Sequence, residues 1–189
     1  MRFITRLSAR HWLTVAAIAV WLLAMLTAFL WFQQQFIRPF SDTSVNLAQL
    51  QLHAPKVLSS PGAVRVVHFW QPGCPCNVAN QAHLAELRVK YQGQNVQFYQ
   101  VRQPGSQGQL PPPLDDLAAL ESTAQFAPPV SPAVGIWDSQ GRLAYFGPYS
   151  EGMVCNAANS FIEPVVDRLL AGKNVSISNA LAVGCFCRW

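Results

Sequence analysis

Two cysteines, Cys74 and Cys76, stand one residue apart in the stretch FWQPGCPCN (69–77), between an apolar run and a segment with helical spacing. Helical residues two apart point about 200° away from each other, so the sulfurs meet only if Cys74 lies in a turn and Cys76 opens the helix. Their Cα atoms then come within the range that a disulfide needs. The free N–H groups of the helix start favour a thiolate at Cys74. The pair predicts thiol–disulfide chemistry, with a metal site or two buried small residues as alternatives.

A long apolar run precedes this pair. Residues 12–32 carry no charge, and as a helix they span about 31 Å, roughly one bilayer core. Three arginines precede the run and a single one soon follows it, so the positive-inside rule predicts a cytoplasmic N-terminus at residues 1–11. The run is longer than the core of a cleaved signal peptide and ends in Leu-Trp-Phe, without a small-x-small site. We expect a single-pass anchor at 12–33 in a bacterial inner membrane, with the remainder in the periplasm.

Charge and cysteine content narrow the classes of function. Of 13 basic side chains, three precede the apolar run, and the remaining ten nearly balance nine acidic ones. No basic stripe is visible, which excludes a nucleic-acid-binding protein. Disulfides persist outside the cytoplasm, and five cysteines follow the apolar run. Because five is odd, at least one is free, transiently paired or bound to something. They are Cys74, Cys76, Cys155, Cys185 and Cys187.

Strand and helix patterns alternate along the outer part of the chain. Apolar runs predict strands over 64–70 and 95–101, with a helix over 77–91 between them. A long loop and a short helix over 114–122 follow, then a hairpin of strands over 132–138 and 142–148. The closing helix is predicted over 151–171, capped by Ser150 and ended by Gly172. This order is typical of an α/β domain with a mixed sheet flanked by helices. We expect a linker and lead-in over 34–61, the domain itself over 62–172 and a cysteine-containing C-terminal tail over 173–189.

Two stretches carry a family resemblance. VVHFWQPGCPCN (66–77) resembles the active-site stretch of thioredoxins, with one residue fewer between the cysteines. VSPAVGIWDSQGRLAYFGPYSEG (130–152) is similar to the cis-proline loop and following hairpin of that family, with Pro132 in the cis-proline place. The two stretches occur in the family's order and together cover about 62–172. A membrane-tethered, outward-facing protein of this kind resembles the TlpA-like group, which implies a thioredoxin-like fold.

The resemblance implies a role for each matching residue. Cys74 would attack a disulfide and form a mixed disulfide, and Cys76 would resolve it. Pro132 would lie against the sulfurs after a cis peptide bond. Ser131 would offer its backbone to an extended peptide, as in strand addition. Trp70 would form a wall of the substrate groove.

His68 stands where thioredoxins bury an acidic residue that is thought to take the proton of the resolving thiol. An imidazole, with an ordinary pKa of about 6.5, is able to do this work. The alternative is a strand histidine that is hydrogen-bonded in the core. Both interpretations remain open at the level of the sequence.

The other three cysteines suggest a bridge between the last helix and the tail. Cys155 lies near the start of the predicted helix over 151–171, which in this fold begins on the side of the active site. Cys185 and Cys187, in GCFCRW, point the same way in an extended chain. The residues between Gly172 and Cys185 reach about 43 Å, enough to return along the helix. We expect Cys155 to bond Cys185 or Cys187, either as a structural staple or with the spare thiol as a relay to Cys74–Cys76.

The leading hypothesis is therefore a membrane-tethered thiol–disulfide oxidoreductase that acts on protein thiols, with a membrane or periplasmic redox partner and no cofactor. The alternative is a copper chaperone or assembly factor on the same fold, since soft thiolates hold Cu(I) well. Copper carriers resembling this fold use a wider cysteine pair and a distal histidine, but no histidine follows the cis-proline region here. A Cu(I) site would instead use Cys74, Cys76 and a tail cysteine. A third hypothesis is an inert interaction module, in which the pair is dispensable.

Overall fold

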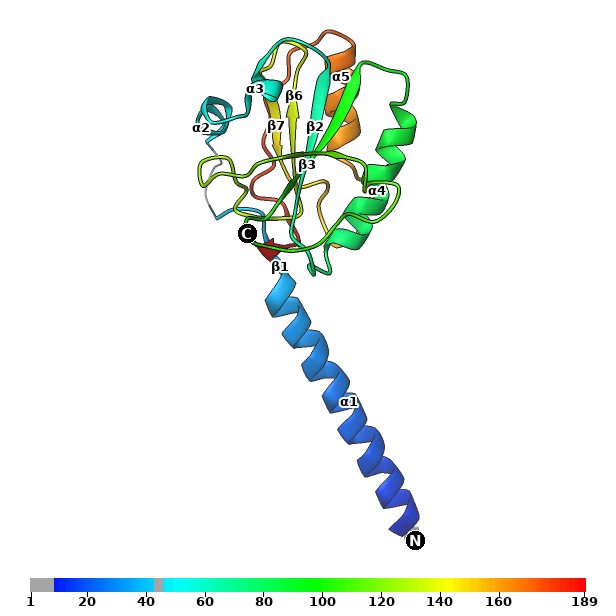
Figure 1. Ribbon diagram of the computed structural model, residues 1–189. Helices are drawn as coiled ribbons and strands as arrows, with labels where there is room; N and C mark the ends of the chain where they lie inside the picture. The colour runs from blue at the N-terminus through cyan, green and yellow to red at the C-terminus, as the bar shows by residue number, and fades with distance from the viewer. Residues whose placement is uncertain (1–8, 43–45) are drawn as a thin grey trace. The chain divides into compact units, whose positions relative to one another are not determined.

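The computed structural model describes residues 9–42 and 46–189, and the chain divides into two compact units between Gln35 and Phe36. Helix α1 (Ala9–Phe36) contains the predicted apolar run (Figure 1). Among the residues described, it is the one helix long and apolar enough to cross a membrane, a test that a signal sequence near the N-terminus also passes.

The second unit is built on a five-stranded mixed sheet (Figure 1). Its central strand β2 (Val64–Trp70) is buried at every position, as a continuous apolar run predicts for a strand covered on both faces. Strand β2 pairs in parallel with one neighbour and antiparallel with the other. The order across the sheet is β4 (Ala118–Leu120), β3 (Val96–Arg102), β2, β6 (Ala133–Trp137) and β7 (Leu143–Gly147).

Two hydrophobic clusters lie on opposite faces of this sheet because successive strand side chains alternate. Val66 of β2 belongs to the first hydrophobic cluster, which is covered by α4 (Asn77–Lys90) and α5 (Ile162–Leu170). Val67, the next residue, belongs to the second hydrophobic cluster, on the other face. Both helices lie on the same side of the sheet in Figure 1.

The second cluster is closed by the segment that precedes the sheet. This segment contains β1 (Ile37–Pro39), α2 (Leu47–Leu52) and α3 (Lys56–Ser59). Phe40, Leu50 and Leu58 from this segment are buried in the cluster. The ring centroid of Phe40 lies 6.1 Å from that of Phe146 and 5.6 Å from that of Phe186. The predicted linker and lead-in therefore supplies part of the core.

The tail is paired with the rest of the domain at two places. Strand β8 (Val183–Cys185) pairs antiparallel with β1, and β9 (Cys187–Arg188) pairs antiparallel with β5 (Val130–Ser131). Between the two strands, Phe186 is buried with only 3% of its surface exposed. The tail has no clear sequence period, yet it is fixed by backbone pairing and one aromatic anchor.

The prediction of a short helix over 114–122 is wrong. Leu114 and Leu117 are buried three residues apart, a spacing that suits a helix, but they lie in turns. The residues after them form β4, which pairs in parallel with the edge of β3. Here the open backbone edge of a sheet overrides the local preference for a helix.

The closing helix is shorter than predicted and starts at Ile162, so Ser150 does not cap it. Asparagine side chains hold the preceding segment in turns: Asn156 Oδ1 accepts from the amide of Ala158, and Asn159 Nδ2 donates to the carbonyl of Val154. Such local bonds compete with helix formation. The amide of Ile162 donates to Ser160 Oγ at 3.1 Å instead. The end of the helix agrees with the prediction, since Gly172 follows it with a φ of +73°.

Two leucines of α2 test whether the lead-in belongs to the domain. Leu50 is 6% exposed and Leu52 is 79% exposed. Leu50→Ala should lower the free energy of unfolding by about 2–4 kcal/mol, because it leaves a cavity in the second cluster. Leu52→Ala, the matched control, should change it by less than about 0.5 kcal/mol. Denaturant unfolding of the oxidised full chain in detergent measures both, and equal effects would contradict the packing described.

Candidate functional site

The Cys-Pro-Cys stretch has the bent shape that the spacing requires. The amide of Cys74 donates to the carbonyl of Gln71 at 3.2 Å, and the amide of Asn77 donates to the carbonyl of Cys74 at 3.1 Å. Cys74 therefore lies in the turn before α4, and Cys76 is the residue that caps the helix. Gly73, with a φ of +78°, makes the turn possible.

Both cysteines are bonded to the tail. Cys74 bonds Cys187 with an S–S distance of 2.09 Å, and Cys76 bonds Cys185 with an S–S distance of 1.99 Å. The structure therefore contains no Cys74–Cys76 bridge. The sulfurs of Cys74, Cys76 and Cys187 nevertheless lie within 4.8 Å of one another. We call the four bonded cysteines the thiol cluster.

The register of the tail explains this pairing. Phe186 points into the second hydrophobic cluster, beside Phe40. Because side chains alternate along an extended chain, the residues on either side of Phe186 point the other way. Cys185 and Cys187 therefore both face the turn before α4, where they pack with Cys74 and Cys76.

The predicted bridge from Cys155 to the tail is wrong. Cys155 is the one free cysteine of the five, all of which lie in the described part of the chain, and it is 7% exposed. It packs in the first hydrophobic cluster with Tyr145 and Tyr149, whereas Cys185 packs with Cys74 and Cys76. Burial raises the pKa of the Cys155 thiol to about 11, so it stays protonated at neutral pH.

The cis-proline loop lies beside the cluster. The Ser131–Pro132 peptide is cis, as the resemblance implies. The carbonyl oxygen of Ser131 lies 3.8 Å from Cys74 Sγ. Ser131 is also paired with Cys187 in the β5–β9 ladder. The backbone edge that was expected to receive an extended peptide thus holds the chain's own tail.

Trp70 does not form the wall of an open groove. Its indole is 3% exposed and packs in the first hydrophobic cluster. Its Nε1–H donates to Gln100 Oε1 at 2.9 Å. The alternation along β2 places Trp70 on the face covered by α4 and α5, which explains its burial.

His68 occupies a hydrogen-bonded position in the core. It is fully buried, and its Nδ1 shares a hydrogen bond of 2.8 Å with the hydroxyl of Tyr149. Burial lowers the pKa of His68 to about 3 and raises that of Tyr149 well above its ordinary value. Its Nε2 has no hydrogen-bond partner among the described residues. The imidazole is therefore neutral at physiological pH and a very weak proton acceptor, which favours the core interpretation over proton transfer.

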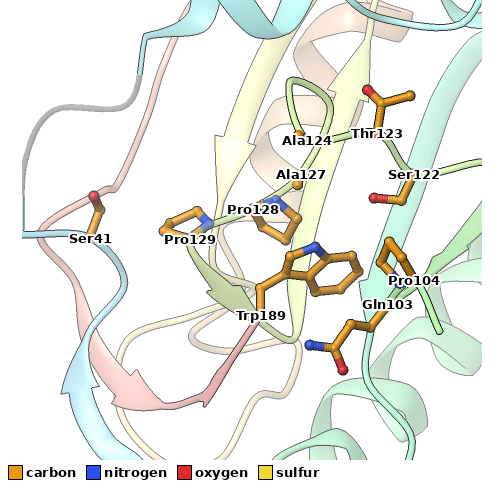
Figure 2. A pocket seen from close by; sticks show the side chains of 10 residues that line it. All are labelled: Ser41, Gln103, Pro104, Ser122, Thr123, Ala124, Ala127, Pro128, Pro129 and Trp189. Atoms are coloured by element: carbon orange, nitrogen blue, oxygen red, sulfur yellow. The ribbon is translucent and has the colours of Figure 1, made fainter. Parts of the chain in front are cut away.

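Sequence reasoning missed a surface hollow beside the cis-proline loop. The hollow has a volume of about 830 Å³ and is lined by residues that include Pro104, Ser122, Pro128, Pro129 and Trp189. Figure 2 shows the Trp189 indole between the two prolines that precede β5 and the Gln103–Pro104 segment. The Pro128–Pro129 pair directly before the cis-proline loop was the available signal for this surface.

The domain has a thioredoxin-like fold. It consists of a β-α-β unit, an antiparallel hairpin and a closing helix, with a cysteine turn after the central strand and a cis-proline opposite that turn. The chain belongs to the family described as domain of unknown function DUF6436, which it matches over residues 43–189.

Solved structures resemble the chain in fold. A hypothetical protein from Sinorhizobium meliloti 1021 is 19% identical with a TM-score of 0.50, and the match covers 81% of this chain and 88% of that one. MTB dsbF is 21% identical with a TM-score of 0.42, covering 68% and 98%. A thiol-disulfide isomerase from Corynebacterium glutamicum is 13% identical with a TM-score of 0.40, covering 76% and 94%. A search of curated proteins finds no match.

The disulfide pattern is directly testable. Peptide mass mapping of the alkylated, non-reduced full chain should recover Cys74 linked to Cys187 and Cys76 linked to Cys185. Cys155 should resist alkylation in the folded protein and react after denaturation, because it is buried and protonated. A Cys155 peptide linked to the tail would contradict the structure.

Acid should weaken the protein partly through His68. Between about pH 6.5 and 3 the imidazole of His68 binds a proton in the unfolded chain but not in the folded one. The stability that the neutral imidazole contributes is therefore complete above about pH 6.5 and is lost as the pH falls. The slope is at most about 1.4 kcal/mol per pH unit. His68→Gln should show a shallower loss of unfolding free energy between about pH 6.5 and 4.5. His53→Gln, an exposed control, should keep the wild-type slope.

Proposed function

We propose that this protein is a membrane-tethered, TlpA-like thiol–disulfide oxidoreductase that acts on protein thiols and disulfides in the bacterial periplasm. In this proposal α1 is an uncleaved anchor in the inner membrane, with residues 1–11 in the cytoplasm. Cys74 attacks and Cys76 resolves. Pro132 and the backbone of Ser131 position the client segment, and a membrane or periplasmic redox partner restores the cysteines.

Each turnover is an exchange of sulfur–sulfur bonds. The thiolate of reduced Cys74 attacks a client disulfide, which breaks into a Cys74–client mixed disulfide and a client thiolate. The thiolate of Cys76 then attacks the Cys74 sulfur, and the second client thiolate leaves. The client gains two electrons, and Cys74 and Cys76 lose them as they bond. The reverse sequence oxidises a client. No proton transfer is assigned to His68.

The observation that carries the proposal is the position of the Cys74 sulfur. It lies at the mouth of a 14-residue helix, 3.8 Å from the carbonyl of Ser131 and beside a cis-proline. Unpaired N–H groups at a helix start stabilise a thiolate, which is the attacking species. A second sulfur, that of Cys76, lies within 4.8 Å. Cys74 is also bonded to Cys187, 113 positions away, so its sulfur does form a disulfide with an extended segment from a distant part of the sequence.

A redox titration tests the proposal. The full chain in detergent, equilibrated with glutathione buffers, should show a reversible transition of the thiol cluster, read by thiol alkylation and mass. Cys74→Ser should abolish reduction of a model protein disulfide. Cys155→Ser, which alters only the buried free thiol, should leave both properties unchanged. A cluster with no reversible transition would remove the oxidoreductase proposal.

Trapping identifies the attacking sulfur. In Cys76→Ser alone, Cys187 is still able to attack Cys74, so mixed disulfides should not accumulate. The three-serine variant (Cys76→Ser, Cys185→Ser and Cys187→Ser) leaves Cys74 without an internal resolving thiol, and mixed disulfides with clients should persist on non-reducing gels. Adding Cys74→Ser to this variant should remove them. Adducts that survive this fourth substitution would place the attack elsewhere.

A second candidate function is Cu(I) binding by the reduced cluster. Three sulfurs within 4.8 Å of one another, those of Cys74, Cys76 and Cys187, are close enough to converge on one soft ion. Reduced full chain should then bind about one Cu(I), measured by competition with a coloured chelator, and Cys187→Ser should weaken binding. If reduced protein does not compete with the chelator, this function is excluded.

A further inference from the structure

We infer that residues 187–189 occupy the client site as an internal copy of the client, and that clients are extended segments with an aromatic residue two positions after the reacting cysteine. This inference rests on the proposed function, and it specifies which segments the site accepts.

The first support is the backbone. Ser131 pairs with Cys187 and Val130 pairs with Arg188 in the antiparallel β5–β9 ladder. The Cys187 sulfur is bonded to Cys74. The tail thus has both features of a client caught in exchange: a strand added to the cis-proline loop and a sulfur joined to the attacking cysteine.

The second support is the side-chain pattern of the tail. Trp189 packs against the second hydrophobic cluster, the one that contains Phe186, so its ring faces the domain. The exposure agrees, since Arg188 is exposed and both of its neighbours are partly buried. The Trp189 ring centroid lies 6.2 Å from that of Phe69, in an edge-to-face contact.

The third support is the hollow around Trp189. No charged side chain occurs among its lining residues in the described part of the chain. Its sides are proline rings and small polar residues, including Pro104, Ser122 and Pro128, which suit a flat ring better than a charged group (Figure 2). The hollow is about 830 Å³ and open, so it has room for an aromatic side chain of another segment once the tail has left.

The tail does not need Trp189 to stay attached. Strand β8 pairs with β1, Phe186 is buried beside Phe40, and two disulfides join the tail to the Cys-Pro-Cys turn. The indole lies beyond these anchors and reaches the hollow with the geometry that a client ring would have. Its position therefore defines a specificity subsite next to the reacting sulfur.

Two peptide probes test the inference. Each carries a cysteine bonded to thionitrobenzoate, followed by Arg-Trp in one probe and Arg-Ala in the other. The thiolate of Cys74 in the three-serine variant attacks the peptide sulfur, forms the mixed disulfide and releases the coloured thionitrobenzoate anion. The second-order rate constant should be about tenfold larger for the Trp probe, because its ring is buried in the hollow.

Removing the internal ring should sharpen this preference. Adding Trp189→Ala to the three-serine variant vacates the hollow, so the ratio of the two rate constants should rise further. Leu181→Ala, which alters a tail residue that is 74% exposed and outside the hollow, should leave the ratio unchanged. The single variant Cys187→Ser, with adducts read by mass, repeats the comparison if the three-serine variant does not fold.

The outcomes separate the two levels of inference. If neither probe forms an adduct with folded protein, the proposed function fails. If both probes react at the same rate, with and without Trp189, only the aromatic subsite is overturned. A disulfide-linked dimer of the wild-type chain, joined through Cys74 and Cys187, would show that a second copy's tail is the occupant and would also overturn the assignment to clients.

Discussion

Backbone pairing of the tail on both sides of Phe186 is the constraint on which the site depends. Strand β8 is held by β1 and β9 is held by β5, while Phe186 is buried between them. With Phe186 turned inward, strand alternation leaves Cys185 and Cys187 no direction except toward the Cys-Pro-Cys turn. The two disulfides follow from this register, and the lead-in that supplies β1 and Phe40 is as necessary to it as the tail itself. The family match runs from residue 43 to 189, so it includes all of the tail but begins after β1 and Phe40.

Surroundings, and not the exposed fraction, divide the five cysteines into two chemical groups, since Cys74, Cys76 and Cys185 are buried about as deeply as Cys155. Cys155 is enclosed among tyrosines and apolar side chains, where desolvation raises the pKa of its thiol and leaves it inert. The other four gather where a turn, a helix start and the cis-proline loop meet, with three sulfurs within reach of one another. The same effect acts on His68, whose imidazole is held neutral in the core beside Tyr149. Position in the fold therefore decides which groups take part in chemistry.

The tail changes the chemistry that is open to the shortened cysteine pair, because it brings two further cysteines to it. With one residue between them, Cys74 and Cys76 each have a second possible partner from GCFCRW, and the described state uses those partners. Exchange among four thiols needs no second protein for its internal steps. It also means that the surface on which a thioredoxin-like protein would receive a client is covered by a segment of the same chain.

The sequence by itself determined the central β-α-β unit and the hairpin, because continuous apolar runs, helical spacing and turn residues are local signals of strong effect. The cis peptide before Pro132 was implied by the resemblance to thioredoxins. The sequence also placed Cys74 in a turn and Cys76 at a helix start, the arrangement in which two sulfurs at this spacing come together, although each is bonded to a tail cysteine instead. Only the tertiary structure decided the disulfide partners, the strand β4 and the late start of α5. These depend on an open sheet edge, on asparagine side chains that bond nearby backbone, and on a tail whose register is set by one buried phenylalanine. The resemblance implied that Trp70 forms a wall of the groove. In the structure, the alternation of side chains along β2 places Trp70 on the face that α4 and α5 cover. A pairing between residues more than a hundred positions apart leaves no local pattern, so it becomes visible only when the chain has folded.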